Sequence, residues 1–308
     1  MSDVVILFSG QGAQKVGMGK DFFEASEAAR AKFAAADEAL GFPLSQVMFE
    51  GPEEELTRTS RCQPALYLHG LIALDLLREK RPDLNPVAAA GLSLGEFTAH
   101  AAAGTFSFED GLRIVAQRGG FMEEACDATQ GAMAAMIGGS DEAVAELAAE
   151  SDVDVANFNC PGQTVISGDE TGVDAAVAAA KEKGIRKAVK LKVAGAYHSR
   201  LMQSAQVKLA EELAGLTMGS PSIPVVCNYA AQAVSEPAEI REMLEKQVTG
   251  SVRWTESIQK LVADGHTTFI ELGPGKVLAG LVAKIAKEVT VISVEDLASL
   301  EAAVEALD

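Results

Sequence analysis

The segment 87–97 contains a serine between two glycines, in the order Gly91-Leu92-Ser93-Leu94-Gly95. A short apolar run follows Pro86 and precedes the motif, and helix-forming residues continue after it to Gly104. Gly-x-Ser-x-Gly between a strand and a helix is typical of a nucleophile elbow, which holds a serine hydroxyl at the end of a sheet beside free helix N–H groups. The same short motif also occurs in ordinary loops. The elbow interpretation therefore requires a base and an oxyanion donor elsewhere in the chain.

His198 is the histidine best placed to be that base. It lies in a short run of small residues, outside any helical stripe or strand core. His100 follows Ser93 on the same predicted helix, about 10 Å along its axis, which is too far for proton transfer. His69 lies among leucines, and His266 lies in a turn. By elimination we predict that His198 accepts the serine proton; a structural role is the alternative.

A glycine-rich loop, Ser9-Gly10-Gln11-Gly12-Ala13, follows a predicted buried strand, Val4 to Phe8. Lys15 stands where a dinucleotide-binding motif has its third glycine, and Walker A spacing is absent, so a phosphate cradle is disfavoured. Backbone N–H groups of such a loop are suited to binding an oxyanion. A plain tight turn is the alternative.

Arg118 falls in the middle of an apolar helix face. Ser107 and Asp110 resemble a capping box that opens this predicted helix, which runs through Ala125. An arginine on a buried stripe is costly unless an anion meets it. A structural ion pair and a bound carboxylate are the two interpretations of Arg118, whereas Arg113 is expected to be an ordinary surface charge.

Residues 131–193 show the order β-α-β-β-α-β, which predicts a small split β-α-β unit inserted into a larger α/β domain. Its last predicted strand, 186–193, places Arg186, Lys190 and Lys192 on one face. The chain as a whole has a formal net charge of −18. This basic row is therefore either a solvated face or a docking site for an acidic partner.

Composition limits the class of protein. The 308 residues are 48% hydrophobic, which indicates a globular protein with a sizeable core. The start lacks the features of a signal peptide, and no apolar run approaches the ~20 residues of a membrane helix. Four widely spaced cysteines fit reduced thiols, so we expect a cytoplasmic protein. The acidic balance disfavours nucleic acid and anionic membranes, and isolated His and Cys residues predict no metal site.

Several motifs, spread over nearly the whole chain, resemble those of the malonyl-CoA:acyl-carrier-protein transacylases, which load malonyl groups in fatty acid synthesis. The matching motifs are Phe8-Ser9-Gly10-Gln11-Gly12, Gln63-Pro64-Ala65-Leu66, Gly91-Leu92-Ser93-Leu94-Gly95-Glu96, Gln117-Arg118-Gly119, Asn157-Phe158-Asn159, Tyr197-His198-Ser199, Val252-Arg253-Trp254 and Glu271-Leu272-Gly273-Pro274-Gly275. The resemblance implies a hydrolase-like α/β domain with a parallel sheet and a nucleophile elbow, at residues 1–127 and 197–308. A small ferredoxin-like domain, 128–196, would interrupt it.

The resemblance also implies a ping-pong transfer of malonyl from malonyl-CoA to the phosphopantetheine thiol of acyl carrier protein. No cofactor is implied, because the CoA thioester is a substrate and the phosphopantetheine belongs to the carrier. The implied site has six members: the nucleophile Ser93, the base His198, the oxyanion-hole N–H groups of Gln11 and Leu94, the carboxylate-binding Arg118, and Gln247, whose backbone carbonyl would orient the histidine.

Two positions depart from the family pattern. Leu92 stands where the family usually has histidine, and Ser9 stands where it usually has proline. Neither change removes a group that the mechanism needs. Leu94 and Tyr197 match residues that accompany a choice of malonyl over methylmalonyl in related modules, because a bulky ring leaves little room for an α-methyl group.

Carrier protein is acidic, so the resemblance points to a basic docking face. We expect it near Arg186, Lys190, Lys192, Arg200 and Lys208. We also expect a monomer. The alternatives are a serine thioesterase or hydrolase with the same elbow, a trans-acting polyketide acyltransferase, a non-enzymatic module that binds carrier protein and, least favoured, a nucleotide-binding protein.

Overall fold

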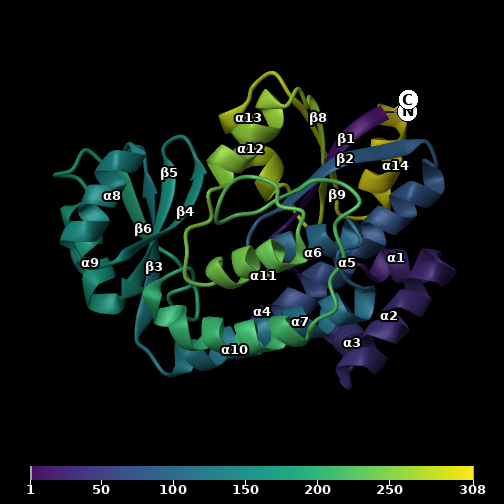
Figure 1. The fold of residues 1–308 in the computed structure, drawn as a ribbon, viewed down its shortest axis with the longest axis horizontal. Helices are drawn as coiled ribbons and strands as arrows, with labels where there is room; N and C mark the ends of the chain where they lie inside the picture. Colours follow the sequence, from purple (N-terminus) through teal and green to yellow (C-terminus); the bar gives the residue numbers. More distant parts are fainter. Residues whose placement is uncertain (1, 308) are drawn as a thin grey trace.

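The computed structural model describes residues 2–307, which form two sheets with helices packed around them (Figure 1). The strands are β1 Ser2–Phe8, β2 Leu84–Gly91, β3 Gly131–Ile137, β4 Asp154–Cys160, β5 Gln163–Asp169, β6 Lys187–Lys190, β7 Val225–Val226, β8 Thr268–Leu272 and β9 Thr290–Val294. The α-helices are α1 Lys20–Ala25, α2 Glu27–Leu40, α3 Leu44–Glu50, α4 Glu53–Thr57, α5 Thr59–Lys80, α6 Leu94–Ala102, α7 Phe108–Asp127, α8 Asp141–Glu150, α9 Glu170–Ala179, α10 Gln203–Gly215, α11 Pro237–Lys246, α12 Trp254–Ala263, α13 Val277–Ile285 and α14 Leu297–Ala306, and a 3₁₀ turn spans Arg200–Met202.

Five parallel strands form the larger sheet, in the order β7-β2-β1-β8-β9. Its central strand β1 is apolar from Val4 to Phe8, and all five of these side chains are buried. Such a continuous apolar run is expected of a parallel strand that is covered on both faces. Because parallel strands end at one edge, the loops after β1, β2 and β7 meet there, which is where ligands bind in open α/β sheets.

Four antiparallel strands form the smaller sheet, in the order β4-β5-β3-β6, with α8 and α9 packed on it (the teal unit in Figure 1). Ser140 and Asp169 cap the two helices through their side chains. This is the ferredoxin-like order β-α-β-β-α-β that the sequence predicts, and the α/β fold class is confirmed. The boundaries given for the inserted domain, 128–196, stay a prediction.

A short segment from the large unit extends the smaller sheet. The N–H of Val252 donates to the carbonyl of Ala156 at 2.8 Å, and the N–H of Phe158 donates to the carbonyl of Val252 at 2.9 Å. Val252 thus forms a parallel bridge with Asn157 on the edge strand β4. Since Val252 precedes α12 of the large unit, main-chain hydrogen bonds join the large unit to the small sheet.

Three predicted elements differ from the observed ones. The alanine-rich segment 21–40, which ends before Gly41, predicts a single helix; the structure has two, because Ser26 turns out of the helix and its side chain caps α2. Because proline is tolerated in the first turn of a helix, Pro64 predicts a helix that begins there. The observed α5 begins five residues earlier, at Thr59, so the proline lies inside it. The strand expected over 186–193 ends at Lys190.

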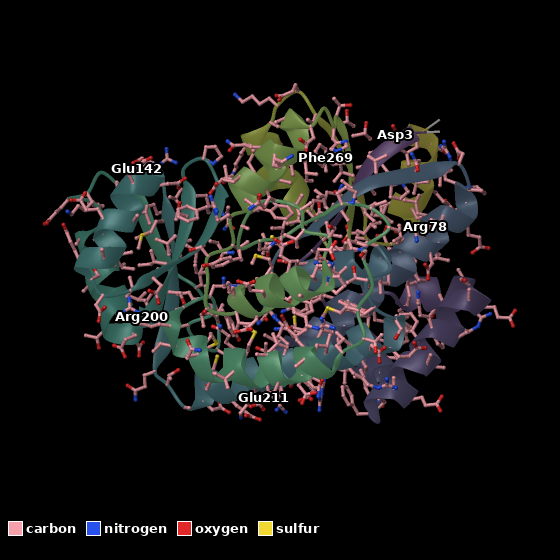
Figure 2. The ribbon with its side chains drawn as sticks, in the orientation of Figure 1. Asp3, Arg78, Glu142, Arg200, Glu211 and Phe269 are labelled. Atoms are coloured by element: carbon pink, nitrogen blue, oxygen red, sulfur yellow. The ribbon has the colours of Figure 1, made fainter. Side chains whose placement is uncertain are left out.

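Two further elements near the C-terminus, β9 and α14, were not predicted. Buried side chains fill the space between the helices and the parallel sheet. Figure 2 labels Phe269 of β8, which is buried, and Glu142 of α8 and Arg200 of the 3₁₀ turn, which are exposed. Within residues 2–307, no helix has the length and apolar character needed to span a bilayer.

Candidate active site

Ser93 lies in the tight turn between β2 and α6, as the elbow interpretation predicts. Its backbone has φ 54° and ψ −106°, a conformation that non-glycine residues rarely adopt. A Cβ on Gly91 would overlap the backbone of Gly95, and a Cβ on Gly95 would overlap the carbonyl of Phe8. Glycine is therefore required on both sides of Ser93.

The side chain of Asn228, which follows β7, forms hydrogen bonds with the backbone of the elbow. Its side-chain oxygen accepts a 2.6 Å hydrogen bond from the N–H of Ser93, and its side-chain N–H donates to the carbonyl of Gly91 at 2.8 Å. One amide thus ties the two ends of the turn together. This contact satisfies backbone groups that a strained turn would otherwise leave unpaired.

His198 faces Ser93. Its Nε2 lies 2.8 Å from Oγ of Ser93, and its Nδ1 lies 2.8 Å from the backbone carbonyl of Gln247. A carbonyl only accepts, so Nδ1 carries the ring proton and Nε2 is free to accept the hydroxyl proton of Ser93. His198 itself has φ 55°, so both members of the pair occupy the left-handed region. Strain of this kind clusters at functional sites.

The charge of His198 suits a base. Burial and the neighbouring Arg118 guanidinium lower the pKa of His198 to about 4. The imidazole is therefore neutral at pH 7 and can take a proton.

Arg118 lies buried on α7 beside Ser93. Its Nη2 donates to Oγ of Ser93 at 3.1 Å and to Oε1 of Gln247 at 2.9 Å, and its Nη1 donates to Oε1 of Gln63 at 2.7 Å. Its buried Nε–H has no acceptor within the described chain. All three of these partners are neutral, and among residues 2–307 no carboxylate lies within ion-pair distance of Arg118. Burial lowers the pKa of Arg118 to about 10, so it remains charged at pH 7.

The carboxylate of Glu96 is linked to Arg118 through the side chain of Gln247. The side-chain Nε2 of Gln247 donates to Oε2 of Glu96 at 2.6 Å and to the backbone carbonyl of Ser93 at 3.0 Å. The N–H of Asn228 donates to the same carboxylate oxygen at 2.9 Å. Glu96 is completely buried, and burial raises its pKa to about 7.

Gln11 and Leu94 lie in the two segments that carry the predicted oxyanion-hole N–H groups, the loop after β1 and the start of α6. Leu94 is the first residue of α6, so its N–H has no acceptor inside the helix. Gln11 follows β1 and lines the cavity that contains Ser93. Its side chain donates weakly to Thr59 and to Tyr197, whose hydroxyl groups lie 2.6 Å apart. The oxyanion role of these N–H groups stays a prediction.

A cavity of about 310 Å³ opens onto Ser93 and His198. The large unit contributes Gln11, Leu92, Val277 and Leu281 to its walls, and the small sheet with the segment after it contributes Asn157, Gln163, Val165, Leu191, Lys192 and Val193. The cavity therefore lies between the two sheets. Within the described residues, no group of three or more His, Cys, Asp or Glu side chains is arranged to hold a metal ion.

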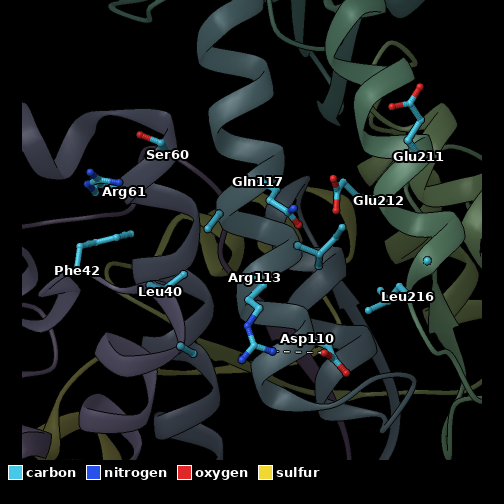
Figure 3. Close-up of a pocket in the computed structure, with 14 residues that line it drawn as sticks. Leu40, Phe42, Ser60, Arg61, Asp110, Arg113, Gln117, Glu211, Glu212 and Leu216 are labelled. Carbon is cyan, nitrogen blue, oxygen red and sulfur yellow. Dashed lines mark ion pairs between the residues drawn. The ribbon is translucent and has the colours of Figure 1, made fainter.

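A second hollow, of about 650 Å³, lies between α2, α7 and α10 (Figure 3). Its polar side chains include Arg113 and Asp110, which form a 3.6 Å ion pair at the surface. Gln117 also lines it, although the neighbouring Arg118 points the other way into the protein. None of the residues predicted for the site faces this hollow, and Arg113 is a surface charge as expected.

The structure thus brings Ser93, His198, Arg118 and Gln247 together, and it adds Glu96 and Asn228, which sequence analysis did not single out. One signal was available for Glu96, which is an acidic residue in the otherwise uncharged and largely apolar segment from Leu94 to Ala99. No local pattern marks Asn228, because it reaches the elbow from 135 positions further along the chain.

A strained serine, a neutral imidazole and a buried guanidinium in this arrangement are suited to acyl transfer through the serine, and comparison with known proteins gives the family of the chain. A family model described as "Acyl transferase domain" matches residues 5–303. The "Malonyl CoA-acyl carrier protein transacylase" of Bacillus subtilis (strain 168) is 44% identical over 312 residues, covering 100% of this chain and 98% of that protein.

Solved structures agree. The malonyl-CoA:acyl carrier protein transacylase of Xanthomonas oryzae pv. oryzae has a TM-score of 0.95 and 42% identity, with 98% of each chain covered. A malonyl-transacylase in complex with a type II PKS acyl-carrier protein has a TM-score of 0.95 and 36% identity, covering 99% of this chain and 100% of that one. The chain belongs to the acyl transferase domain family and, within it, to the malonyl CoA-acyl carrier protein transacylases.

Proposed function

We propose that this chain transfers the malonyl group from malonyl-CoA to the phosphopantetheine thiol of acyl carrier protein, through an ester on Ser93. The single observation that carries the proposal is the buried Arg118 guanidinium, which donates to Oγ of Ser93 and has only neutral partners within the described chain. A cation in this position favours an acyl group that carries its own carboxylate. Malonyl is such an acyl group, with its carboxylate one methylene away from the thioester carbonyl.

The first half-reaction forms the acyl-enzyme. The Ser93 hydroxyl passes its proton to Nε2 of His198 as Oγ bonds to the thioester carbon. The N–H groups of Gln11 and Leu94 stabilise the oxyanion of the tetrahedral intermediate. The carbon–sulfur bond then breaks, and the CoA sulfur leaves with the proton that His198 returns.

The second half-reaction reverses these steps with a different thiol. The carrier thiol gives its proton to His198 and attacks the malonyl-Ser93 carbon. The carbon–oxygen bond breaks, and Ser93 regains the proton. The first half-reaction converts a thioester into an ester, and the second converts the ester back into a thioester, so no resident cofactor or metal ion is needed.

We also assign residues 1–127 and 197–308 to a catalytic domain and 128–196 to an inserted domain, because the cavity has walls from both.

For the carrier, we place the docking surface at three lysines around the cavity mouth, Lys192, Lys276 and Lys284. Lys192 lines the cavity, Lys276 precedes the lining residue Val277, and Lys284 donates to the lining residue Gln163 at 3.4 Å. These three lysines are exposed and, within residues 2–307, pair with no carboxylate. We call them the rim lysines.

Three of the cations proposed from the sequence are less suited to docking the carrier, because they already form ion pairs with carboxylates of this chain. Lys190 pairs with Glu170 at 3.0 Å and Asp174 at 2.8 Å. Arg200 pairs with Asp152 and Asp154, and Lys208 pairs with Glu124. Such pairs reduce the positive potential that an acidic partner would meet. Arg186 is exposed and remains available at the far end of β6.

Labelled malonyl-CoA tests the proposal. Incubated alone, the protein should acquire one covalent malonyl group, and added holo carrier protein should remove that label as malonyl-carrier. A thioesterase would instead release free malonate, with no need for carrier. Release of malonate faster than transfer, or absence of label, would contradict the proposed function.

A further inference from the structure

Glu96 is a buried carboxylate that the transfer steps do not use. It lies on the first turn of α6, three residues after Ser93, and is fully buried. Its Oε1 has no hydrogen-bond partner within the described chain, whereas Oε2 accepts two hydrogen bonds. Burying a carboxylate in this way is costly unless it is paired. Its charged neighbour is Arg118, reached through one side chain, that of Gln247.

Gln247 has contacts on both sides that fix the direction of its amide. Arg118 is only a donor, so it requires the amide oxygen of Gln247. Oε2 of Glu96 already accepts from the N–H of Asn228, so it acts as an acceptor and requires the amide nitrogen. The two distances, 2.9 Å and 2.6 Å, agree with this assignment. Without an acceptor at position 96, the amide nitrogen of Gln247 would keep its 3.0 Å hydrogen bond to the backbone carbonyl of Ser93 but lose its shorter one, so the amide would be held less firmly against the guanidinium.

The direction of this amide matters for two groups of the site at once. The amide oxygen positions Nη2 of Arg118, which also contacts Oγ of Ser93. The backbone carbonyl of the same glutamine accepts from Nδ1 of His198. A displaced Gln247 side chain would therefore move the malonyl-binding cation and disturb the carbonyl that orients the base.

We propose that Glu96 is a positioning residue, which fixes the Gln247 amide and through it sets Arg118 and His198 relative to Ser93. This inference rests on the proposed malonyl transfer. In this role Glu96 does not contact the substrate. Its effect is transmitted by the hydrogen bond that it accepts from Nε2 of Gln247.

A variant series tests this role. Glu96→Ala should lower kcat/KM for malonyl transfer about tenfold or more, and it should lower the ratio of malonyl to acetyl transfer, because a buried hydrogen-bonded network is lost. Glu96→Gln should recover activity to within about threefold, since its amide oxygen can still accept from Asn228 and Gln247. Its new NH₂ group would occupy the place of Oε1, which has no partner now.

The coupling between the two residues is the decisive measurement. Gln247→Ala keeps the backbone carbonyl and removes the side-chain bridge. If Glu96 acts through this side chain, the double variant Glu96→Ala/Gln247→Ala should transfer malonyl no more slowly than Gln247→Ala alone. Effects that multiply would overturn the inference.

Glu271 provides a matched control. It is also a fully buried glutamate, but it bonds the N–H groups of Leu278 and Ala279, away from Gln247. Glu271→Gln should leave the malonyl-to-acetyl ratio unchanged whatever it does to Tm. A fall in Tm for Glu96→Ala with the ratio unchanged would show a merely structural role and would overturn the inference.

If Glu96→Ala does not fold, Glu96→Asp replaces it. This variant keeps the charge but withdraws the carboxylate by one methylene, so the ratio should fall, and an unchanged ratio would overturn the inference. The wild-type chain is assayed first with labelled malonyl-CoA and carrier protein. Failure of the wild type would contradict the proposed function, whereas an active wild type with uncoupled Glu96 variants would contradict only the role of Glu96.

Discussion

Oγ of Ser93 and Nε2 of His198 lie 2.8 Å apart, although 105 positions separate the two residues in the chain. Their meeting depends on two separate parts of the fold. The elbow after β2 presents the serine, and the segment that returns from the small sheet presents the histidine. The serine hydroxyl and the imidazole are therefore aligned before any substrate is bound.

Substitution of this pair should stop the reaction at the first half-step. We expect Ser93→Ala to abolish covalent labelling by malonyl-CoA and to lower the transfer rate by more than about 10³-fold, because the nucleophile is lost. Mass spectrometry of the intact protein would detect the acyl adduct. His198→Ala should keep Ser93 but acquire label very slowly. Label on Ser93→Ala would remove this serine from the role.

Arg118 should determine the choice of acyl group. Arg118→Ala removes the charge-assisted hydrogen bonds to a malonyl carboxylate, worth roughly 1.5–3 kcal/mol each, so malonyl transfer should fall about 100-fold relative to acetyl transfer. Arg113→Ala, on the exposed face of the same helix, is the control and should change neither rate. Equal losses for the two acyl groups in Arg118→Ala would exclude a carboxylate-binding role.

The rim lysines should affect the carrier more than the CoA substrate. Lys192→Ala removes an exposed charge at the cavity mouth and should raise KM for carrier protein about threefold to tenfold, with a weaker salt dependence. Lys190→Ala is a closely matched control, because it lies two residues earlier and its charge is already paired with Glu170 and Asp174. The same change in KM for both variants would argue against the rim as the docking surface.

The pH dependence of acylation should reflect the environment of His198. The imidazole must be neutral to accept a proton, and its pKa is lowered to about 4 by burial and by Arg118. The kcat/KM for malonyl-CoA should therefore stay level from pH 7.5 to about 5 and fall as the pH drops through about 4. In Arg118→Ala the acid limb should move to higher pH, because a cation that disfavours imidazolium is gone. A wild-type limb near 6.5 would contradict this account.

Two adjacent glycines on α7 should respond in opposite ways. A Cβ on Gly119 would overlap the backbone of Thr59 at the start of α5, whereas a Cβ on Gly120 would meet no atom within 4 Å. Gly120→Ala should raise the free energy of unfolding by about 1 kcal/mol, the usual helix preference for alanine. Gly119→Ala should lower it and should reduce malonyl transfer, since α7 carries Arg118. Urea denaturation followed by circular dichroism would compare the two.

Much of the site could be predicted because its signals are local. The elbow is a five-residue pattern after an apolar run, and Arg118 is conspicuous on a helical wheel because a charge there faces the core. The β-α-β-β-α-β order of the small sheet follows from alternation and turn residues. His198 was found by eliminating the other three histidines, since nothing in its own neighbourhood identifies a base.

What the sequence did not reveal depends on contacts between distant segments. Asn228 and Glu96 meet across 132 positions, and no periodicity encodes such a pair. The sequence alone predicts that Lys190 is an unpaired cation, but in the fold it forms ion pairs with Glu170 and Asp174 of α9. The helix break at Ser26 was missed because a side-chain cap there competes with continued helix in a segment rich in alanine.

The bridge between Val252 and β4 has a consequence for how substrates enter. Only four residues lie between Val252 and Gln247, whose carbonyl accepts from the imidazole. If the small sheet swung away to widen the entrance, it would pull on this short connection and misplace the base. The two units should therefore move as one body during turnover. The pantetheine arm of each thioester substrate should then enter through a channel of fixed width.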